Sequence, residues 1–278
     1  MIEFLKETFS LLPFLFATYL VLETVEAKAG GALEKFLGRA RSVGPLAGSL
    51  AGAVPQCGIS AAAASFYAGG LISLGTLAAV FLSTSDELVP VLFSKRIPID
   101  VLAKIVGIKI VAAMLAGFAI DAFSRLIGSS GKKMSVGELC RHSHCGCSSR
   151  KGIVVPALIH TAEIFLFIFA VSAVIEIGMH CFGDGFLDSL RLNTPFLGEI
   201  FSGLVGLVPN CAVSVAGAQL YSSGAMSAGA MMSLSFTGSG LGLLVLFRTN
   251  RSWKENLLIL LLVYVTGTLL GMVSGGFL

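Results

Sequence analysis

The sequence has few charged residues for its length. Only 13% of its 278 residues are Asp, Glu, Lys or Arg, whereas 55% are hydrophobic, and the mean hydropathy is +0.89. A soluble protein of this size would need far more polar surface to cover its core. The composition therefore excludes a soluble globular protein and predicts an all-α integral membrane protein.

Two kinds of functional feature are also absent. The net charge is only +3 and no basic face is visible, which argues against a nucleic-acid partner. The sequence has no Gly-rich phosphate loop followed by Lys and Ser or Thr, and no catalytic constellation can be assembled from it. We therefore expect neither ATP hydrolysis nor another enzymatic activity.

Long apolar runs occupy most of the chain. A helix needs about 20 residues to cross the hydrocarbon layer of a bilayer, and several runs are that long or longer. The sequence therefore predicts a multi-pass protein in contact with membrane lipid. The runs are 9–25, 43–82, 99–120, 153–181, 196–247 and 256–278.

The chain carries an internal repeat at an offset of 154 residues. Residues 50–93 and 204–247 align without a gap, and 16 of the 44 positions are identical. Two related halves, each with an apolar run broken at the same place, are typical of transporters with one central site between repeats. The identical positions include Gly52/Gly206, Cys57/Cys211, Tyr67/Tyr221, Gly70/Gly224, Ser73/Ser227, Gly75/Gly229 and Ser85/Ser239.

Each half has an interrupted apolar segment, at 44–70 and at 196–224. Its middle reads Val-Pro-Gln-Cys-Gly-Ile-Ser in the first half and Val-Pro-Asn-Cys-Ala-Val-Ser in the second. Proline disrupts a continuing helix, and each segment is too long for one span and too short for two. We expect a re-entrant helical hairpin with the motif at its tip. A strongly kinked crossing helix is the alternative.

The other spans follow the same order in both halves. Three spans and one hairpin give an odd number of crossings, so the second repeat must be inverted relative to the first. The N-terminal run has no small-residue cleavage site and is expected to stay in the protein. The predicted spans are 9–28, 71–94 and 99–127 in the first half, and 157–181, 225–247 and 255–277 in the second.

The chain divides into a first transmembrane repeat (1–127), a His/Cys-rich linker (128–152) and a second transmembrane repeat (153–278). The linker is rich in Lys and Arg, so the positive-inside rule predicts that it is cytoplasmic. The pair Lys95-Arg96 then falls on the outside and violates the rule.

The two broken segments predict the substrate site. A helix broken inside a membrane exposes backbone groups, so the break must lie within protein or line a wet cavity. The half-helix after each break points a partly positive N-terminus at this site, and cysteine sulfur suits thiophilic ions. Alternatively, both cysteines are small buried hydrophobic residues. The candidate substrate-binding residues are Gln56, Cys57, Ser60, Asn210, Cys211 and Ser214.

An acidic pair, Asp86 and Glu87, lies deep in an apolar segment. The second half has Gly240 and Leu241 at these positions, so the repeat's architecture does not need the pair. Each charge costs about 2.5–3.5 kcal/mol at the bilayer centre. We expect the pair to couple transport to a proton or another cation, unless it lies close to the water surface. Lys109, well inside the last span, either pairs with a carboxylate or attracts an anion.

The linker contains a dense cluster of soft ligands. Three cysteines and two histidines lie within eight residues, a density that suits Zn(II), Cu(I) or a thiol-seeking metalloid. The spacing matches no standard zinc finger, so a regulatory or substrate-delivery role is favoured over structural zinc. A flexible polar linker is the alternative, and no cofactor is required elsewhere. The candidate ligands are Cys140, His142, His144, Cys145 and Cys147.

These motifs together resemble a family of bacterial heavy-metal exporters. The resemblance rests on the paired Pro-x-Cys motifs, the Ser-Thr-Ser-Asp-Glu segment at 83–87 and the His/Cys cluster. Members of the family carry the labels manganese transporter and arsenic efflux protein. The resemblance implies ten spans, five in each half, so each hairpin could instead count as a pair of spans.

From the residues and the resemblance together, we expect a secondary active transporter of the bacterial inner membrane. It would export a thiophilic metal or metalloid in exchange for protons. A carrier of a small organic or inorganic anion is the alternative, and a non-transporting membrane receptor is the third interpretation. The oligomeric state stays open, with a homo-oligomer included.

Overall fold

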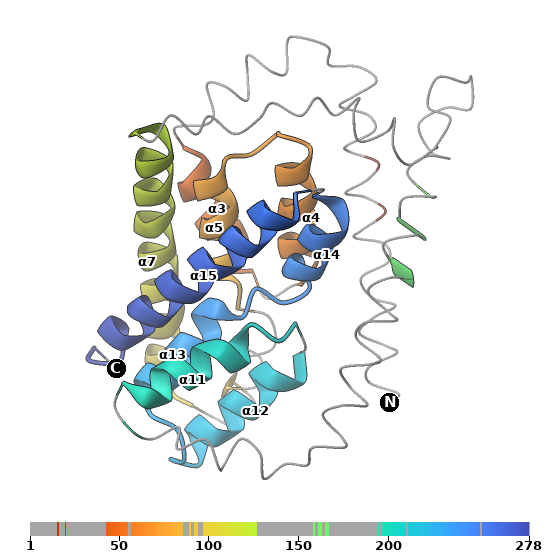
Figure 1. Cartoon of the computed structure of the whole chain (residues 1–278). Coiled ribbons are helices and arrows are strands. Elements are labelled where there is room, and N and C mark those ends of the chain that lie inside the picture. Colours follow the sequence, from red (N-terminus) through yellow and green to blue (C-terminus); the bar gives the residue numbers. More distant parts are fainter. Residues whose placement is uncertain are drawn as a thin grey trace, which may run out of the picture.

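The computed structural model describes residues 43–54, 57–85, 97–126, 196–209, 211–250 and 252–277. It also describes positions 16, 20, 89, 92, 93, 158, 161, 162, 165, 166 and 194. The regular elements of this described part are all α-helices (Figure 1). They are α3 (Gly44–Gly52), α4 (Cys57–Ala68), α5 (Leu74–Ser83), α7 (Ile99–Leu126), α11 (Leu197–Gly206), α12 (Cys211–Ser222), α13 (Ala228–Thr237), α14 (Gly242–Thr249) and α15 (Trp253–Ser274).

The helices of each half pack in the same order. In the first half α3 packs on α5, α5 packs on α7, and α4 lies against α5. In the second half α11 packs on α13, α13 packs on α15, and α12 lies against α13. The halves also interlock, because α14 of the second half packs on α4 of the first.

Three helices are long and apolar enough to cross a membrane. They are α7, α15 and the stretch 228–249, in which α13 and α14 follow each other. The outer faces of α7 and α15 are apolar, with Leu115 and Phe118 exposed on one and Leu258 and Leu261 exposed on the other. Such faces fit the hydrocarbon of a bilayer. Three of the expected spans, 99–127, 225–247 and 255–277, are therefore matched by long apolar stretches in the described part.

The interior, by contrast, contains many polar groups. Lys109 is completely buried, and the side chains of Asp121, Glu199 and Asn256 are each less than 9% exposed. Buried Ser and Thr residues accompany them on α5, α13 and α15. Polar groups thus share the interior with the apolar core, while the outer faces of α7 and α15 are apolar, which supports the membrane assignment.

Glycines allow the helices to approach closely at matching places in the two halves. A Cβ on Gly52 of α3 would lie 2.2 Å from Ser83 Oγ, and a Cβ on Gly206 of α11 would lie 2.2 Å from Thr237 Oγ1. Small residues at helix contacts are the usual way in which membrane helices pack. These glycines bring α3 and α11 into backbone contact with α5 and α13.

The turns that join consecutive short helices are also alike. Gly70 after α4 and Gly224 after α12 have φ angles of 71° and 79°. In both turns the glycine N–H donates to the carbonyl of the tyrosine three residues earlier, at 2.9 Å for Tyr67 and 3.1 Å for Tyr221. Glycine is the residue that ends helices in this left-handed conformation. The backbone conformation therefore explains why glycine occupies this position in both halves.

The next helix begins at a serine cap in both halves. Ser73 Oγ accepts from the N–H of Thr76 at 3.1 Å, and Ser227 Oγ accepts from the N–H of Ala230 at the same distance. Capping of this kind fixes where a helix starts. It sets the first residues of α5 and α13.

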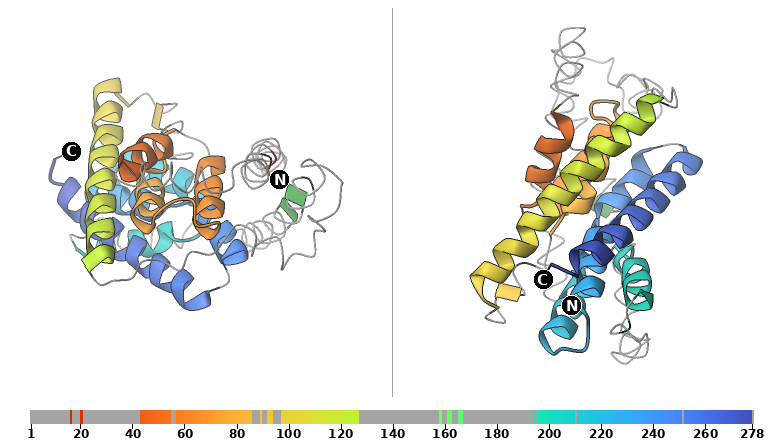
Figure 2. Two further views of the ribbon diagram at one scale, coloured as in Figure 1. Left: turned by 90° about the horizontal axis from the view of Figure 1, so that it is seen from above. Right: turned by 90° about the vertical axis from the view of Figure 1, so that its left-hand side faces the viewer.

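α5 and α13 begin at opposite ends of the molecule. Gly75 near the start of α5 lies against Gly117 close to the end of α7, and Gly229 near the start of α13 lies against Gly275 just after α15. In Figure 1, α7 ends at the top left, while the chain end that follows α15 is marked at the bottom left. Figure 2 shows the same long helices from two further sides.

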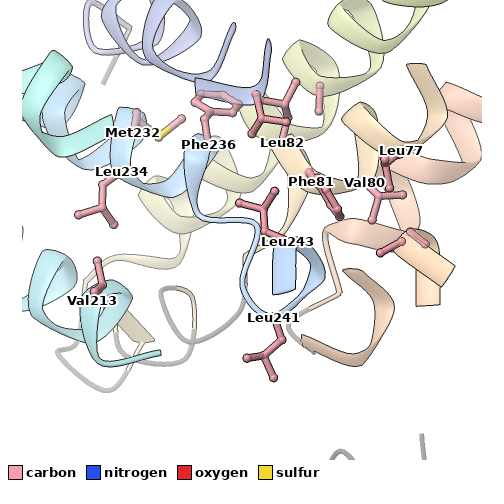
Figure 3. Packing of buried hydrophobic residues seen from close by; sticks show 14 of the residues in the cluster. Leu77, Val80, Phe81, Leu82, Val213, Met232, Leu234, Phe236, Leu241 and Leu243 are labelled. Atoms are coloured by element: carbon pink, nitrogen blue, oxygen red, sulfur yellow. The ribbon is translucent and has the colours of Figure 1, made fainter. Parts of the chain in front are cut away.

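The apolar core lies where α5 meets α13. Leu82 and Phe236 are both fully buried, and Figure 3 shows their side chains next to each other. Val213 of α12 points toward Leu234 of α13 in the same view. The offset of 154 residues relates Leu82 to Phe236, so equivalent positions of the two halves meet in this core.

Some helix boundaries agree with the sequence analysis, whereas the expected span 71–94 differs, because α5 ends at Ser83, and the expected span 225–247 is divided into α13 and α14. Both interrupted segments break at the Pro-x-Cys motif, since α3 ends at Gly52 and α4 begins at Cys57, and α11 ends at Gly206 and α12 begins at Cys211. α15 begins two residues before the expected 255, because Ser252 caps it by accepting from the N–H of Glu255 at 3.4 Å. The first spans (9–28 and 157–181) and the linker lie largely outside the described residues.

Gly206→Ala tests the close approach of α11 to α13. The added Cβ would lie 2.5 Å from the carbonyl oxygen of Leu234 as well as 2.2 Å from Thr237 Oγ1, so the helices must separate. Overpacking of this kind costs about 1–3 kcal/mol. We expect a lower midpoint of thermal unfolding in detergent, followed by circular dichroism.

Gly107→Ala is the matched control, because a Cβ on Gly107 of α7 meets nothing within 4 Å. Alanine in a helix interior is favoured over glycine by about 0.5–1 kcal/mol. The control should be neutral or slightly stabilised, and equal losses in the two variants would contradict the packing interpretation.

Candidate functional site

The two cysteine motifs stand at the start of α4 and α12. Cys57 and Cys211 are the first residues of these helices, so each motif is followed by a helix N-terminus with its unpaired N–H groups and partial positive charge. The sequence analysis expected this arrangement. The side chains of Gln56, Cys57, Asn210 and Cys211 lie outside the described residues.

The starts of α4 and α12 lie at the depth where α5 and α13 end. α4 and α5 are joined by the five residues 69–73, and α12 and α13 by the five residues 223–227. A turn this short makes consecutive helices run in opposite directions. The first turn of α4 is accordingly beside the last turns of α5, because a Cβ on Gly242 would contact both Ser60 and Phe81.

Lys109 joins the ends of α5 and α13. Its ammonium donates to the carbonyl oxygen of Thr84, which directly follows α5. It also donates to Ser235 of α13, at 3.0 Å to the carbonyl oxygen and 2.6 Å to Oγ. A cation is favoured near the C-terminus of a helix, where carbonyl groups carry partial negative charge.

The ammonium also lies beside an aromatic ring. Lys109 is 0% exposed, and its Nζ lies 5.8 Å from the centre of the Phe236 ring, within cation–π range. The equivalent position in the second half is Val263, which is also buried. The lysine is therefore a feature of one half that connects both.

The two motif serines have different neighbours. Ser60 is completely buried beside Gly242 of α14 and Phe81 of α5. Ser214 is partly buried on α12, a helix that packs on α13. The described contacts therefore assign each serine to its own helix pair.

The predicted ion-coupling pair, Asp86 and Glu87, lies outside the described residues. The two residues just before it are buried, since Thr84 is 3% and Ser85 is 1% exposed. The predicted metal ligands of the linker, from Cys140 to Cys147, also lie outside the described part. Within the described part, no group of three or more His, Cys, Asp or Glu side chains could hold a metal ion.

Two buried acids escaped the sequence analysis. Asp121 of α7 lies at the start of α5, and Glu199 of α11 lies at the start of α13. A signal for Glu199 was available, because it is the only Asp, Glu, Lys, Arg or His in the run 196–247. An ionisable residue inside a membrane segment is a functional candidate by default.

A cavity of about 440 Å³ lies between α3, α4 and α5. Its wall is formed by glycine, alanine and larger apolar residues, with Ser73 and Thr76 as the only polar side chains. Metal ions require several N, O or S ligands. This cavity therefore does not provide a metal site.

The second link between the halves is a short hydrogen bond. The hydroxyl of Tyr67, near the end of α4, donates to Glu255 Oε1 in the first turn of α15 at 2.5 Å. Together with the contact between α4 and α14, it anchors α4 of the first half on the second half.

Residues 2–197 match the model of a family described as "Putative, 10TM heavy-metal exporter". The chain belongs to this family. The match covers the first half and the start of the second, and it agrees with the resemblance seen in the motifs. The family consists of multi-pass membrane transporters rather than enzymes, and a heavy metal is its described substrate.

No curated protein and no solved structure matches the chain. Its function is therefore inferred from the family description and from the geometry of the described helices.

Replacing Lys109 by Met tests the connection between α5 and α13. Methionine fills similar space but removes the donor to Thr84 and Ser235. A buried polar group that loses its partner costs about 1–3 kcal/mol. We expect a large drop in the midpoint of thermal unfolding of the purified protein in detergent.

Lys104→Met is the control, since Lys104 is an exposed residue of the same helix and such substitutions change stability by about 0.5 kcal/mol or less. If the two variants unfolded at the same temperature, Lys109 would not hold these helix ends together.

Proposed function

We propose that this exporter is a secondary active transporter that moves a thiophilic metal or metalloid out of a bacterial cell in exchange for protons. The observation that carries the proposal is the presence of a cysteine at the start of both α4 and α12 in a chain of the heavy-metal exporter family. Its membrane would be the bacterial inner membrane.

The proposal includes two inverted repeats. It is supported by the pairs Gly52/Gly206, Gly70/Gly224 and Ser73/Ser227, which make the same contacts in both halves. The opposite directions of α5 and α13, and the contact between Leu82 and Phe236 in Figure 3, are what a two-fold axis between the halves would produce.

Helix lengths support a site at the middle of the membrane. α5 and α13 have 10 residues each, which corresponds to about 15 Å at 1.5 Å per residue. The hydrocarbon layer is about 30 Å thick. Two helices that enter from opposite sides and end at Lys109 would each cross half of it, and α4 and α12 would then begin at this depth.

At that depth the proposed substrate site combines amide, hydroxyl and thiol groups. Cysteine thiolates are the ligands that soft metals and metalloids prefer, and two of them from different repeats would let each half hold the substrate in turn. The proposed site residues are Gln56, Cys57, Ser60, Asn210, Cys211 and Ser214.

Asp86 and Glu87 are the proposed coupling charges. The chain enters this pair through the buried residues Thr84 and Ser85, close to the ammonium of Lys109. Carboxyl groups in poorly solvated surroundings bind protons more readily. Proton release at this pair would accompany the outward step of the metal.

A carrier of small anions is the second candidate function. It is favoured by the buried cation Lys109 and by two helix N-termini at the same depth, since both attract negative charge. In that case the cysteines would be incidental.

Cys57→Ser and Cys211→Ser separate the two functions. The full-length protein is reconstituted in liposomes with a pH gradient, and uptake of arsenite, Zn(II) or a small anion is measured by mass spectrometry of the washed vesicles. Removing a residue that hydrogen-bonds to a metal ligand already lowers metal affinity or activity about tenfold. Removing a ligand itself should therefore lower metal flux by at least as much.

Cys181→Ser is the control, because this cysteine lies outside both motifs. Full transport in the double variant Cys57→Ser/Cys211→Ser would favour the anion carrier. An absence of flux from wild-type protein under every gradient would contradict both transport functions and favour a receptor.

The cysteines of the linker are proposed as an accessory metal site that delivers or senses the substrate. Replacing Cys140, Cys145 and Cys147 together by Ser should reduce the metal that the purified protein retains after dialysis. Flux at saturating metal should remain, because the central site is intact. Loss of flux with unchanged metal content would contradict an accessory role.

A further inference from the structure

The start of α5 is capped by an acid, and both of its carboxylate oxygens accept hydrogen bonds. Asp121 of α7 accepts from the N–H of Gly75 at 2.8 Å through Oδ1 and from Ser73 Oγ at 2.7 Å through Oδ2. Anions are stabilised at helix N-termini by such donors. Asp121 is therefore a structural cap of α5.

A different acid, Glu199, lies at the start of α13, and its hydrogen bonding differs from that of Asp121. Glu199 comes from α11 and is 8% exposed, and its Oε1 lies 2.6 Å from the position of a Cβ on Gly229. Its other oxygen, Oε2, is buried and has no hydrogen-bond partner in the described part of the chain. Each half thus places one acid at the start of the equivalent helix. Both oxygens of Asp121 accept hydrogen bonds, whereas Oε2 of Glu199 has no partner among the described residues.

Two further buried hydroxyls near Glu199 are also without partners among the described residues. They are Ser202 Oγ and Thr268 Oγ1. Ser202 follows Glu199 by three residues on the same helix, a spacing that makes them neighbours. Thr268 Oγ1 lies 2.4 Å from the position of a Cβ on Gly203, one turn from Glu199. Three buried oxygens without partners therefore lie on α11 or on the face of α15 that packs against it.

No charged group compensates Glu199 from the described helices packed on α11. α12 and α13 contain no Asp, Glu, Lys, Arg or His, and the charged residues of α15 are Lys254 and Glu255 in its first turn, more than two turns before Tyr264 and Thr268, which lie beside Gly203 of α11. A buried carboxylate without a partner is costly. A protonated carboxyl is neutral and therefore needs no charged partner in this buried position.

We propose that Glu199 is a proton-binding site within the α11–α13–α15 group. Oε2 takes one proton from the aqueous phase and later returns it, leaving the carboxylate, and no other bond changes. Its part in coupling rests on the proposed function, since only a proton-driven exporter would use it in transport. The site is separate from Asp86 and Glu87, because it belongs to the second half.

Infrared spectroscopy of the reconstituted full-length chain tests protonation directly. We expect a protonated-carboxyl C=O band at neutral pH that is lost in Glu199→Gln and shifted in Glu199→Asp. Asp121→Asn is the matched control and should leave the band unchanged, because both oxygens of Asp121 accept hydrogen bonds. If wild type and Glu199→Gln gave the same carboxyl spectrum, Glu199 would carry no proton.

Flux measurements then test coupling. Gln resembles the protonated state, so Glu199→Gln should lose metal flux driven by a pH gradient but keep metal–metal exchange across the membrane. Undiminished pH-driven flux in this variant would overturn the coupling role.

The two proposals fail in different ways. If the carboxyl band depended on Glu199 but the protein moved no metal, Glu199 would still be a proton-binding site, and the export function would be contradicted. If Glu199 only capped α13 as a charge, Glu199→Gln would lower the unfolding temperature as Asp121→Asn does, and no band would be lost.

Discussion

The ammonium of Lys109 occupies the place where two helices end inside the protein. A helix that stops within the hydrocarbon layer leaves carbonyl groups that water cannot reach, and each must find a donor. Lys109 donates to the carbonyls of Thr84 and Ser235, so α5 and α13 can end near each other. Because short turns fold α4 and α12 back along them, the cysteine-bearing helix starts are set at the same depth.

The two halves share geometry but not charge. Several identical positions are helix caps, a left-handed turn and close glycine contacts, which serve the backbone. The charged positions differ: Lys109 corresponds to Val263 and Asp121 to Gly275, whereas Glu199 of the second half corresponds to Pro45. A shared scaffold with different charged groups is expected if both halves must make the same fold while transport uses a single coupling path.

The helices and their breaks were largely predictable from the sequence, because apolar runs and Pro-x-Cys motifs act locally. The last span of the first half was expected at 99–127 and α7 is Ile99–Leu126. The roles of Lys109, Asp121 and Glu199 were not predictable, since each depends on which helix lies opposite. Asp121 caps a helix that starts 47 residues earlier at Leu74. No local pattern encodes such a pairing.

The contact between α4 and α14 has a consequence for biosynthesis. The ribosome completes α4 and Lys109 well before Ser235, Gly242 and Glu255, which hold them in place. The nascent first half must therefore wait in the bilayer while Lys109 lacks its contact with Ser235 and α4 lacks its contacts with α14 and α15. Native structure is reached only after synthesis of the C-terminal part, so assembly is post-translational, and an insertase or chaperone would be needed most during this interval.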